Sequence, residues 1–372
     1  MAHSISKYFQ DLQDPRSDQG KRHLLTDMIV LTVCAVICGA DGWAEVEDFG
    51  KAKEGWLRVF LKLPHGIPSH DTFGRVFSVL DPQALETCFM SWFKHLSQIN
   101  RGQQIAIDGK TLRHSFDSAS NKAAIHMVSA WCQTNHLVMG QLATEAKSNE
   151  ITAIPKLLEL LDLTHSVVTI DAMGCQKTIA RQIVDQSGDY VLGLKGNQGT
   201  LHQRVKRLFD EALTQGWAGT RHGYHETIEK DHGRIETRRL WCTDSIDWVR
   251  NRHSWPGLRS IVCVESQRTI QNKTSIERRY YISSLDGQHP KKMAEVIRGH
   301  WGIENSLHWS LDVTFREDDC RIRQGHAAEH LARFRRLAVS LLKQEKTFKA
   351  GLKRKRLRCA LDPSYLNRVL VS

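Results

Sequence analysis

The sequence lacks the features that mark secreted and membrane-spanning chains. Its most apolar segment, residues 28–40, is shorter than the roughly 20 apolar residues that a bilayer-spanning helix needs, and acidic residues follow it. The first seven residues contain no apolar run of the kind found in signal peptides. No internal repeat or low-complexity linker divides the chain. We therefore expect a cytoplasmic protein without a membrane partner.

Cysteine is present but lacks the spacing of a disulfide framework or a zinc ribbon. The nine cysteines are irregularly spaced, and no Cys-x-x-Cys pair occurs. An odd number at irregular spacing is typical of a reducing compartment. The sequence also lacks a Walker-type phosphate loop, because residues 193–198 do not have the Gly-Lys-Ser/Thr order.

Positive charge is in excess. The 372 residues include 52 Lys and Arg against 41 Asp and Glu, which gives a formal net charge of +11. The hydrophobic share of 41% is ordinary and excludes wholesale disorder. A basic surplus of this size favours a polyanionic partner, most often nucleic acid, while a basic enzyme without such a partner is the alternative.

The order of predicted elements suggests a helical domain followed by an α/β domain. Residues 1–100 read as helices, with an apolar helix at 28–38 and another beginning at the capping cluster 69–72. These helices would either bind DNA or serve as packing. The second domain, residues 101–372, then shows the order β-β-β-α-β-α-β, which predicts a mixed sheet flanked by helices. The predicted elements are strands at 105–107, 125–132, 136–144, 166–170 and 190–194 and helices at 150–161 and 175–186.

Residues 220–290 interrupt this alternation and predict a β-rich insertion. A long helix then runs from about residue 290 past residue 311, and another covers about 325–343. The chain closes with a predicted basic tail that begins near residue 343.

Asp108 and Asp171 each follow a short apolar strand, at the position where side chains leave the core of an α/β sheet. A strand-end Asp is often only a turn former. In the predicted order, however, the first and fourth strands can lie side by side. Two neighbouring carboxylates repel each other and are tolerated when a divalent cation bridges them.

A third carboxylate, Glu304, falls on the apolar face of the helix after residue 290. Gly299 and Gly302 on that helix indicate close approach of another backbone. A carboxylate on such a face needs a shifted pKa, a cation or a metal, and a structural salt bridge to an Arg is the alternative. The face comprises Met293, Val296, Ile297, Trp301, Leu307 and Leu311.

The segments around these acids resemble the three acidic motifs of DDE transposases, and more closely those of the H-repeat-associated group of bacterial insertion sequences. The segments are residues 105–113, 168–176 and 300–309, and further similar motifs lie at 14–16, 68–73, 195–198 and 232–236. The resemblance spans nearly the whole chain. It implies an RNase H-like catalytic domain with a β insertion between the second Asp and the Glu.

The resemblance is incomplete around the third acid. Many relatives carry Tyr, Arg and Lys at six before, four before and seven after the Glu, where this chain has Arg298, His300 and Leu311. Trp301 matches an aromatic residue that relatives place against distorted terminal bases, although a core Trp is the alternative. The candidate DNA contacts, each of which could equally have an ordinary role at the surface or the rim of the site, are Lys110, Arg113, Lys195, Arg298, His300, Trp301 and His308.

The resemblance implies a transposase that cleaves and joins the ends of its own insertion sequence. Asp108, Asp171 and Glu304 would hold two Mg²⁺ or Mn²⁺ ions, because carboxylates suit these hard cations. The implied partners are double-stranded DNA with terminal inverted repeats, target DNA and further copies of the chain. Two alternatives remain: an inactive transposase-derived DNA-binding protein, and a metal-dependent nuclease without strand transfer.

Overall fold

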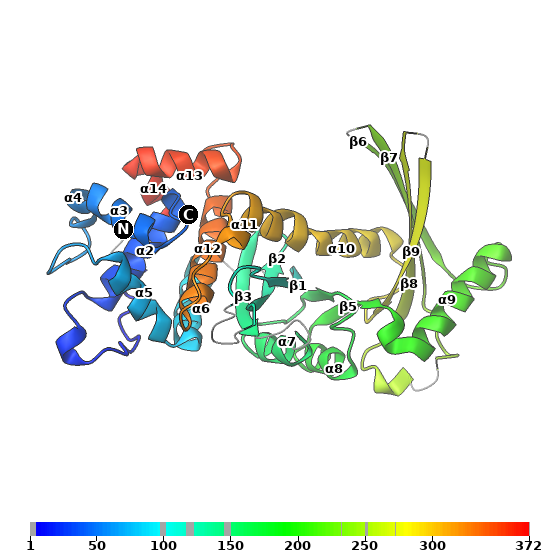
Figure 1. The fold of residues 1–372 in the computed structure, drawn as a ribbon. Coiled ribbons are helices and arrows are strands. Elements are labelled where there is room, and N and C mark those ends of the chain that lie inside the picture. Colours follow the sequence, from blue (N-terminus) through cyan, green and yellow to red (C-terminus); the bar gives the residue numbers. More distant parts are fainter. Residues whose placement is uncertain are drawn as a thin grey trace. The chain divides into compact units, whose positions relative to one another are not determined.

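The computed structural model describes residues 5–96, 102–116, 123–144, 150–231, 233–249, 252–271 and 273–371 (Figure 1). His232, in one of the recognised motifs, lies outside the described residues. The chain forms two compact units that both draw on distant segments. Unit 1 comprises Met1–Asn100, Gly109–Asn149 and Glu304–Ser372, and unit 2 comprises Arg101–Asp108 and Glu150–Ile303.

Residues 5–96 of unit 1, the described part of the predicted helical region, form helices joined by turns and loops. Ser69 caps one helix, because its hydroxyl accepts a hydrogen bond from the backbone N–H of Thr72 at 3.4 Å. The helices are α2 (Leu25–Cys38), α3 (Trp43–Ala52), α4 (Glu54–Leu57), α5 (His70–Val79) and α6 (Pro82–Leu96), after the 3-10 turn η1 (Asp18–Gly20).

The core of unit 1 forms around α12 (Ala327–Gln344), which contacts α2, α5 and α6. The ring centroid of Phe334 lies 5.3 Å from that of Phe77 and 5.5 Å from that of Phe89, both edge-on. The helix also contacts β3 (Leu137–Thr144), which pairs antiparallel with β2 (His126–Cys132). The N-terminal helices therefore share one core with a later part of the chain.

The stretch predicted as a basic C-terminal tail is largely helical in its described part. Helices α13 (Leu352–Leu361) and α14 (Pro363–Val371) occupy this stretch, and α13 contacts α2 and α12. Lys355 and Arg356 are buried, where the Nζ of Lys355 donates to the carbonyls of Leu342 and Glu345 and Arg356 pairs with Asp41 at 3.2 Å.

Unit 2 is a mixed sheet that confirms the predicted α/β alternation. Strand β1 (Gln104–Thr111) enters it with residues 104–108 and pairs parallel with β4 (Val167–Ile170), which pairs parallel with β5 (Asp189–Leu194). Helices α7 (Glu150–Glu159) and α8 (Lys177–Asp185) lie on one side of these strands and α10 (Pro290–Gly302) lies on the other (Figure 1).

The predicted β-rich insertion is confirmed and extends the same sheet. The order continues from β5 to β9, β8, β7 and β6, and all of these neighbours are antiparallel. Met293, Val296 and Ile297 of α10 pack on buried residues of these strands, such as Leu240 and Val262. The insertion comprises α9 (Gly199–Thr214), after the short turn η3 (Gly196–Gln198), and then β6 (Gly223–Asp231), β7 (Arg234–Thr243), the 3-10 turn η4 (Arg252–Ser254), β8 (Ser260–Ile270) and β9 (Lys273–Ser283).

The long helix predicted from residue 290 past residue 311 is interrupted. After α10 the chain forms a π-helical segment, η5 (Ile303–His308), and then α11 (Trp309–Val313) and the 3-10 turn η6 (Glu317–Asp319). A π-helical turn is wider than an α-helical one, so it shifts which residues face inward on either side.

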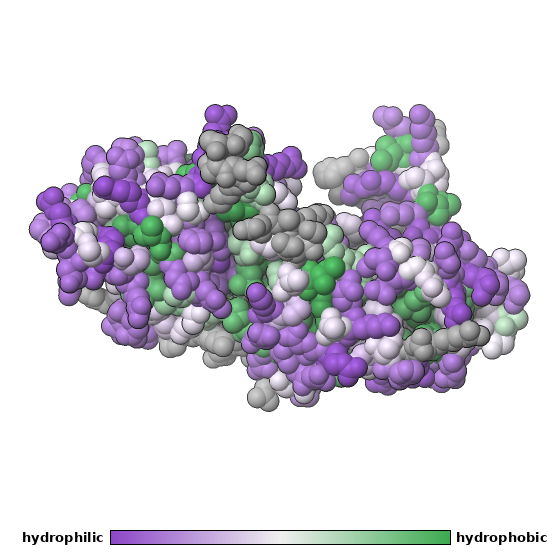
Figure 2. Space-filling view, turned by 60° about the horizontal axis from the view of Figure 1, so that its bottom comes forward, coloured by the Kyte–Doolittle hydropathy of each residue, from purple (hydrophilic) through white to green (hydrophobic). Residues whose placement is uncertain are grey.

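Exposed hydrophobic side chains are scattered over the described surface. Figure 2 shows one face, where hydrophilic residues predominate and hydrophobic ones form small patches. No single helix in the described ranges has the length and apolarity to cross a membrane. The pair α2 and α3, bent by 95°, meets the length and composition criteria only when taken together.

Phe334→Ala should lower the free energy of unfolding by about 3–5 kcal/mol, because the buried ring fills the space between α5 and α6. Urea denaturation followed by circular dichroism measures this loss. Leu361→Ala is the control, since that side chain is 73% exposed and should change stability by less than about 0.5 kcal/mol. Equal effects of the two substitutions would contradict a core centred on α12.

Candidate active site

Asp108 and Asp171 occupy matching positions on adjacent parallel strands of unit 2. The register of β1 and β4 ends with Ile107 opposite Ile170, and each aspartate is the next residue. Both side chains are half-buried. The first and fourth strands therefore lie side by side, as the order of elements predicted. One detail was wrong: β1 continues to Thr111, so Asp108 does not end its strand.

The loop after β4 holds the Asp171 carboxylate in a tight turn. Its Oδ1 accepts hydrogen bonds from the backbone N–H groups of Met173 at 2.9 Å and Gly174 at 3.4 Å. Asp171 is thus a turn former, which was the alternative that its position at a strand end left open. The hydrogen bonds of the turn fix the orientation of its carboxylate. Gly174 is required sterically, because a Cβ there would lie 2.3 Å from Cγ2 of Ile170.

A second segment, which follows β5, packs on this loop. The side chain of Asn197 donates to the carbonyl of Ala172 at 2.6 Å, and that of Gln198 donates to the carbonyl of Cys175 at 2.9 Å. Gly193 allows close approach, since a Cβ at this position would lie 3.1 Å from the nitrogen of Ala172. We call Gly193, Asn197 and Gln198 the amide clamp.

Sequence reasoning flagged residues 195–198 as a motif but assigned no role to Asn197 or Gln198. Two adjacent amide side chains at the end of a buried strand are a usable signal, because such groups commonly satisfy loop carbonyls. Lys195, the predicted phosphate contact in this motif, is exposed and is not part of the clamp.

His300 lies near the Asp171 end of the sheet. Its Nδ1 is 3.0 Å from the hydroxyl of Thr169, two residues before Asp171 on β4. Burial lowers the pKa of His300, and the negative charge of Asp171 opposes that shift without reversing it. His300 is therefore a neutral imidazole at pH 7.

Arg298 and Trp301, on the same helix, line a cavity of about 160 Å³ between α10 and strands β6–β9. The guanidinium of Arg279 lies 4.6 Å from the ring centroid of Trp301, in cation–π contact. Arg298 is exposed and pairs with Glu229 at 3.1 Å. Trp301 is half-buried at this cavity, which does not favour the alternative of a core tryptophan.

Glu304 is exposed, so the prediction of a carboxylate buried on an apolar face is wrong. It lies in the π-helical segment, where the wider turn changes the phase of the helix. Ile303 and Leu307 are buried there instead. His308, at the end of the same segment, is half-buried. In the described ranges, no three or more His, Cys, Asp or Glu side chains are grouped as a metal site. The structure thus brings Asp108 and Asp171 to matching positions within unit 2, whereas Glu304 belongs to unit 1.

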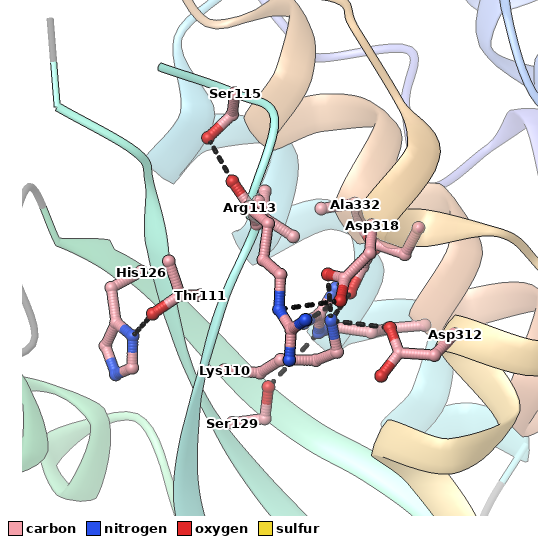
Figure 3. Close-up of polar contacts among 12 residues, drawn as sticks. Lys110, Thr111, Arg113, Ser115, His126, Ser129, Asp312, Asp318 and Ala332 are labelled. Carbon is pink, nitrogen blue, oxygen red and sulfur yellow. Dashed lines mark hydrogen bonds and ion pairs between the residues drawn. The ribbon is translucent and has the colours of Figure 1, made fainter.

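Lys110 is the centre of a buried ion cluster in unit 1 (Figure 3). Its Nζ lies 2.7 Å from Asp312, 2.8 Å from Asp318 and 3.5 Å from Glu317, and its side chain is only 9% exposed. Arg113 is exposed and also pairs with Asp318, at 3.1 Å. The sequence suggested that Lys110 is either a phosphate contact or an ordinary surface charge. Neither role is compatible with its burial, because carboxylates far along the chain surround its amine.

A second buried pair completes the cluster. Arg336 and Glu317 are both fully buried and 2.6 Å apart. Although burial alone would raise the pKa of Glu317, the charges of Arg336 and Lys110 lower it. Burial would likewise lower the pKa of Lys110, but the charge of Glu317 and the bonds to Asp312 and Asp318 raise it. Both shifts favour the charged forms of Glu317 and Lys110, whereas burial raises the pKa of Asp312.

Comparison with known proteins decides the family. Residues 100–341 match the family Transposase DDE domain, and residues 6–93 match the family DDE_Tnp_1-associated. The chain belongs to the DDE transposase family. This membership confirms the resemblance inferred from the acidic motifs, and the fold is RNase H-like, as that family's catalytic domain is.

Two relatives are similar to this transposase-family chain over nearly its whole length, and a third is similar over a short stretch. "Putative transposase YncI" of Escherichia coli O157:H7 is 45% identical, over 99% of this chain and 95% of the relative. "H repeat-associated putative transposase YhhI" of Escherichia coli K12 is 41% identical, over 98% and 97%. "Inactive transposase YbfQ" of the same strain is 48% identical, but over only 15% of this chain and 67% of the relative.

Lys110→Met in this transposase-family chain should lower the free energy of unfolding by about 3–5 kcal/mol at pH 7, because it strands buried carboxylates. The loss should shrink at pH 4. The pKa of Glu317 is lower in the folded protein than in the unfolded protein. The ionised carboxylate therefore stabilises the wild type above the unfolded-state pKa, and this stabilisation is lost as the pH falls through the folded-state pKa. Denaturation at both pH values measures the difference. Lys206→Met, at an exposed lysine, is the control, and a pH-independent loss for Lys110→Met would contradict the ion cluster.

Proposed function

We propose that this chain catalyses divalent-metal-dependent DNA cleavage and strand transfer at the ends of its insertion sequence. The observation that carries the proposal is the register of β1 and β4, which puts Asp108 and Asp171 at matching positions. Membership of the transposase family supports DNA as the substrate. Glu304 is proposed as the third acid from the motif resemblance, and its exposure leaves its carboxylate accessible.

The donor set suits Mg²⁺ or Mn²⁺. Carboxylate oxygens are the ligands that these hard cations prefer, and two aspartates at neighbouring positions need a positive charge to offset their repulsion. When bound, a pair of such ions would activate a water or a 3′-hydroxyl and stabilise the leaving 3′-oxygen. The turn after β4 orients the Asp171 carboxylate, and the amide clamp keeps that turn in place.

The neighbouring residues are proposed to hold the DNA. His300 is neutral and its Nδ1 is close to Thr169, so its Nε2 would hydrogen-bond a phosphate rather than pair with it as a cation. Arg298 and Trp301 flank a cavity in which Trp301 would contact a terminal base. Arg113, Lys195 and His308 remain proposed DNA contacts, whereas Lys110 is withdrawn because it is buried. A homo-oligomer on DNA is also proposed.

Asp108→Asn should reduce nicking and strand transfer by at least about 100-fold, because losing even a residue that only hydrogen-bonds a metal ligand costs about 10–100-fold. The assay uses supercoiled plasmid carrying the DNA that flanks the gene, with Mg²⁺ or Mn²⁺. Asp171→Asn and Glu304→Gln should behave alike. Asp185→Asn is the matched control, an exposed aspartate of unit 2 in α8 that should keep full activity.

The outcomes separate this proposal from its alternatives. Cleavage that persists in Asp108→Asn would refute the site. Salt-dependent binding without metal-dependent cleavage in the wild type would favour a DNA-binding protein that no longer catalyses. The Leu at position 311, where many relatives have Lys, leaves that possibility open. Cleavage without any joined product would favour a nuclease.

Asn197→Ala and Gln198→Ala should each slow cleavage by about 10–100-fold, because they release carbonyls of the Asp171 loop. DNA affinity in EDTA should not change, and a higher Mn²⁺ concentration should restore part of the rate. Gln203→Ala, at an exposed glutamine of α9, is the matched control. A loss of rate that Mn²⁺ does not restore would argue against a role in positioning Asp171.

A further inference from the structure

A cavity of about 300 Å³ in unit 1 lies outside the acidic site. It is formed by the end of α12, the connection at residues 345–351, the start of α13 and the turn between β2 and β3. The titratable residues that line it are His136, Lys343, Glu345, Lys346, Lys349 and Lys355. We call this cavity the lysine pocket. Most of its lining follows residue 341, where the match to the transposase family ends.

One lysine and one glutamate build the wall of the pocket and neutralise each other. Lys355 is buried, and its Nζ donates to the carbonyls of Leu342 and Glu345 and lies 3.5 Å from the Glu345 carboxylate. That carboxylate also accepts hydrogen bonds from the backbone N–H of Thr347 at 2.7 Å and from the hydroxyl of Tyr365 at 2.6 Å. The nearest charge to the Glu345 carboxylate among the lining residues is therefore that of Lys355, with which it is paired.

The remaining lysines have no anionic partner. Lys343, Lys346 and Lys349 make no ion pair within the described part of the chain, and Glu345 is the sole carboxylate among the lining residues that the structure describes. Lys346 and Lys349 are exposed, while Lys343 is half-buried with its Nζ 5.7 Å from the ring centroid of Trp131. The pocket thus carries three uncompensated positive charges.

The excess of positive charge lowers the pKa values of Lys343 and His136. Burial lowers the pKa of Lys343, and the charges of Lys346 and Lys355 lower it further. Burial also lowers the pKa of His136, with Lys343 and Lys346 adding to the shift. The Nδ1 of His136 is buried without a hydrogen-bond partner in the described ranges. A bound anion would relieve both conditions, because it offsets the repulsion and offers acceptor oxygens.

We propose that the lysine pocket binds a backbone phosphate of DNA. The ammonium groups of Lys343, Lys346 and Lys349 would surround the phosphate oxygens, which suits recognition of charge without recognition of sequence. The choice of DNA as the source of the phosphate rests on the proposed function. The pocket would hold the duplex in position and take no part in the chemistry of the acidic residues.

The test compares the double variant Lys346→Gln/Lys349→Gln with wild type. Fluorescence anisotropy measures binding of a 30-base-pair duplex of arbitrary sequence in EDTA at several salt concentrations, so that the result does not depend on catalysis. Losing two phosphate contacts should weaken binding and reduce the slope of log K against log salt by about 1.8. The control, Lys62→Gln/Lys206→Gln, removes two exposed lysines outside the pocket and should leave the slope unchanged.

An equal loss in the control would overturn the proposal, because it would show that affinity follows total charge. An unchanged slope in the pocket variant, with thermal melting confirming that it is folded, would also overturn it. Thermal shift with inorganic phosphate at constant ionic strength distinguishes the other source. If phosphate stabilises only wild type and DNA affinity is the same in both proteins, the pocket serves free phosphate and the DNA proposal fails.

Discussion

Repulsion between two carboxylates is the constraint on which the candidate site depends. Parallel pairing of β1 and β4 stops with Ile107 opposite Ile170, so Asp108 and Asp171 emerge at the same level of the sheet. Two negative charges on neighbouring strands repel each other unless a cation or a proton lies between them. An arrangement that costs stability is expected at a site of chemistry, and this one suits the metal-dependent reaction proposed for the chain.

The structure around Asp171 is built to keep the carboxylate in one orientation. Glycine at 174 admits the turn, and glycine at 193 lets the end of β5 approach the loop. Asn197 and Gln198 then satisfy two carbonyls of that loop with side-chain amides. These contacts come from a segment that lies 26 residues or more after the aspartate in the chain, and for that reason the local sequence pattern indicated no role for Asn197 or Gln198.

The positive surplus divides into two classes. Lys110 and Arg336 are buried and matched by carboxylates, so they stabilise the fold and contribute little to the external field. Lys343, Lys346 and Lys349 share one cavity and form no ion pair within the described ranges, where the one lining carboxylate, Glu345, pairs with Lys355. The net charge of +11 therefore indicates less about DNA binding than do the cations that have no carboxylate partner in the described part of the chain.

Sequence by itself determined the α/β order, the β insertion, the family and the two aspartates after buried strands, because apolar runs and the acids that follow them are local signals. Only the tertiary structure decided the rest. Lys110 looked like a surface charge but is enclosed by Asp318, 208 residues along the chain. With the periodicity of an α-helix, the sequence predicts Glu304 on an apolar face. The structure has a π-helical turn at this position, and Glu304 is exposed. Pairing between distant residues and a change of helical phase leave no trace in local patterns, because each is fixed by packing against segments far away in the chain.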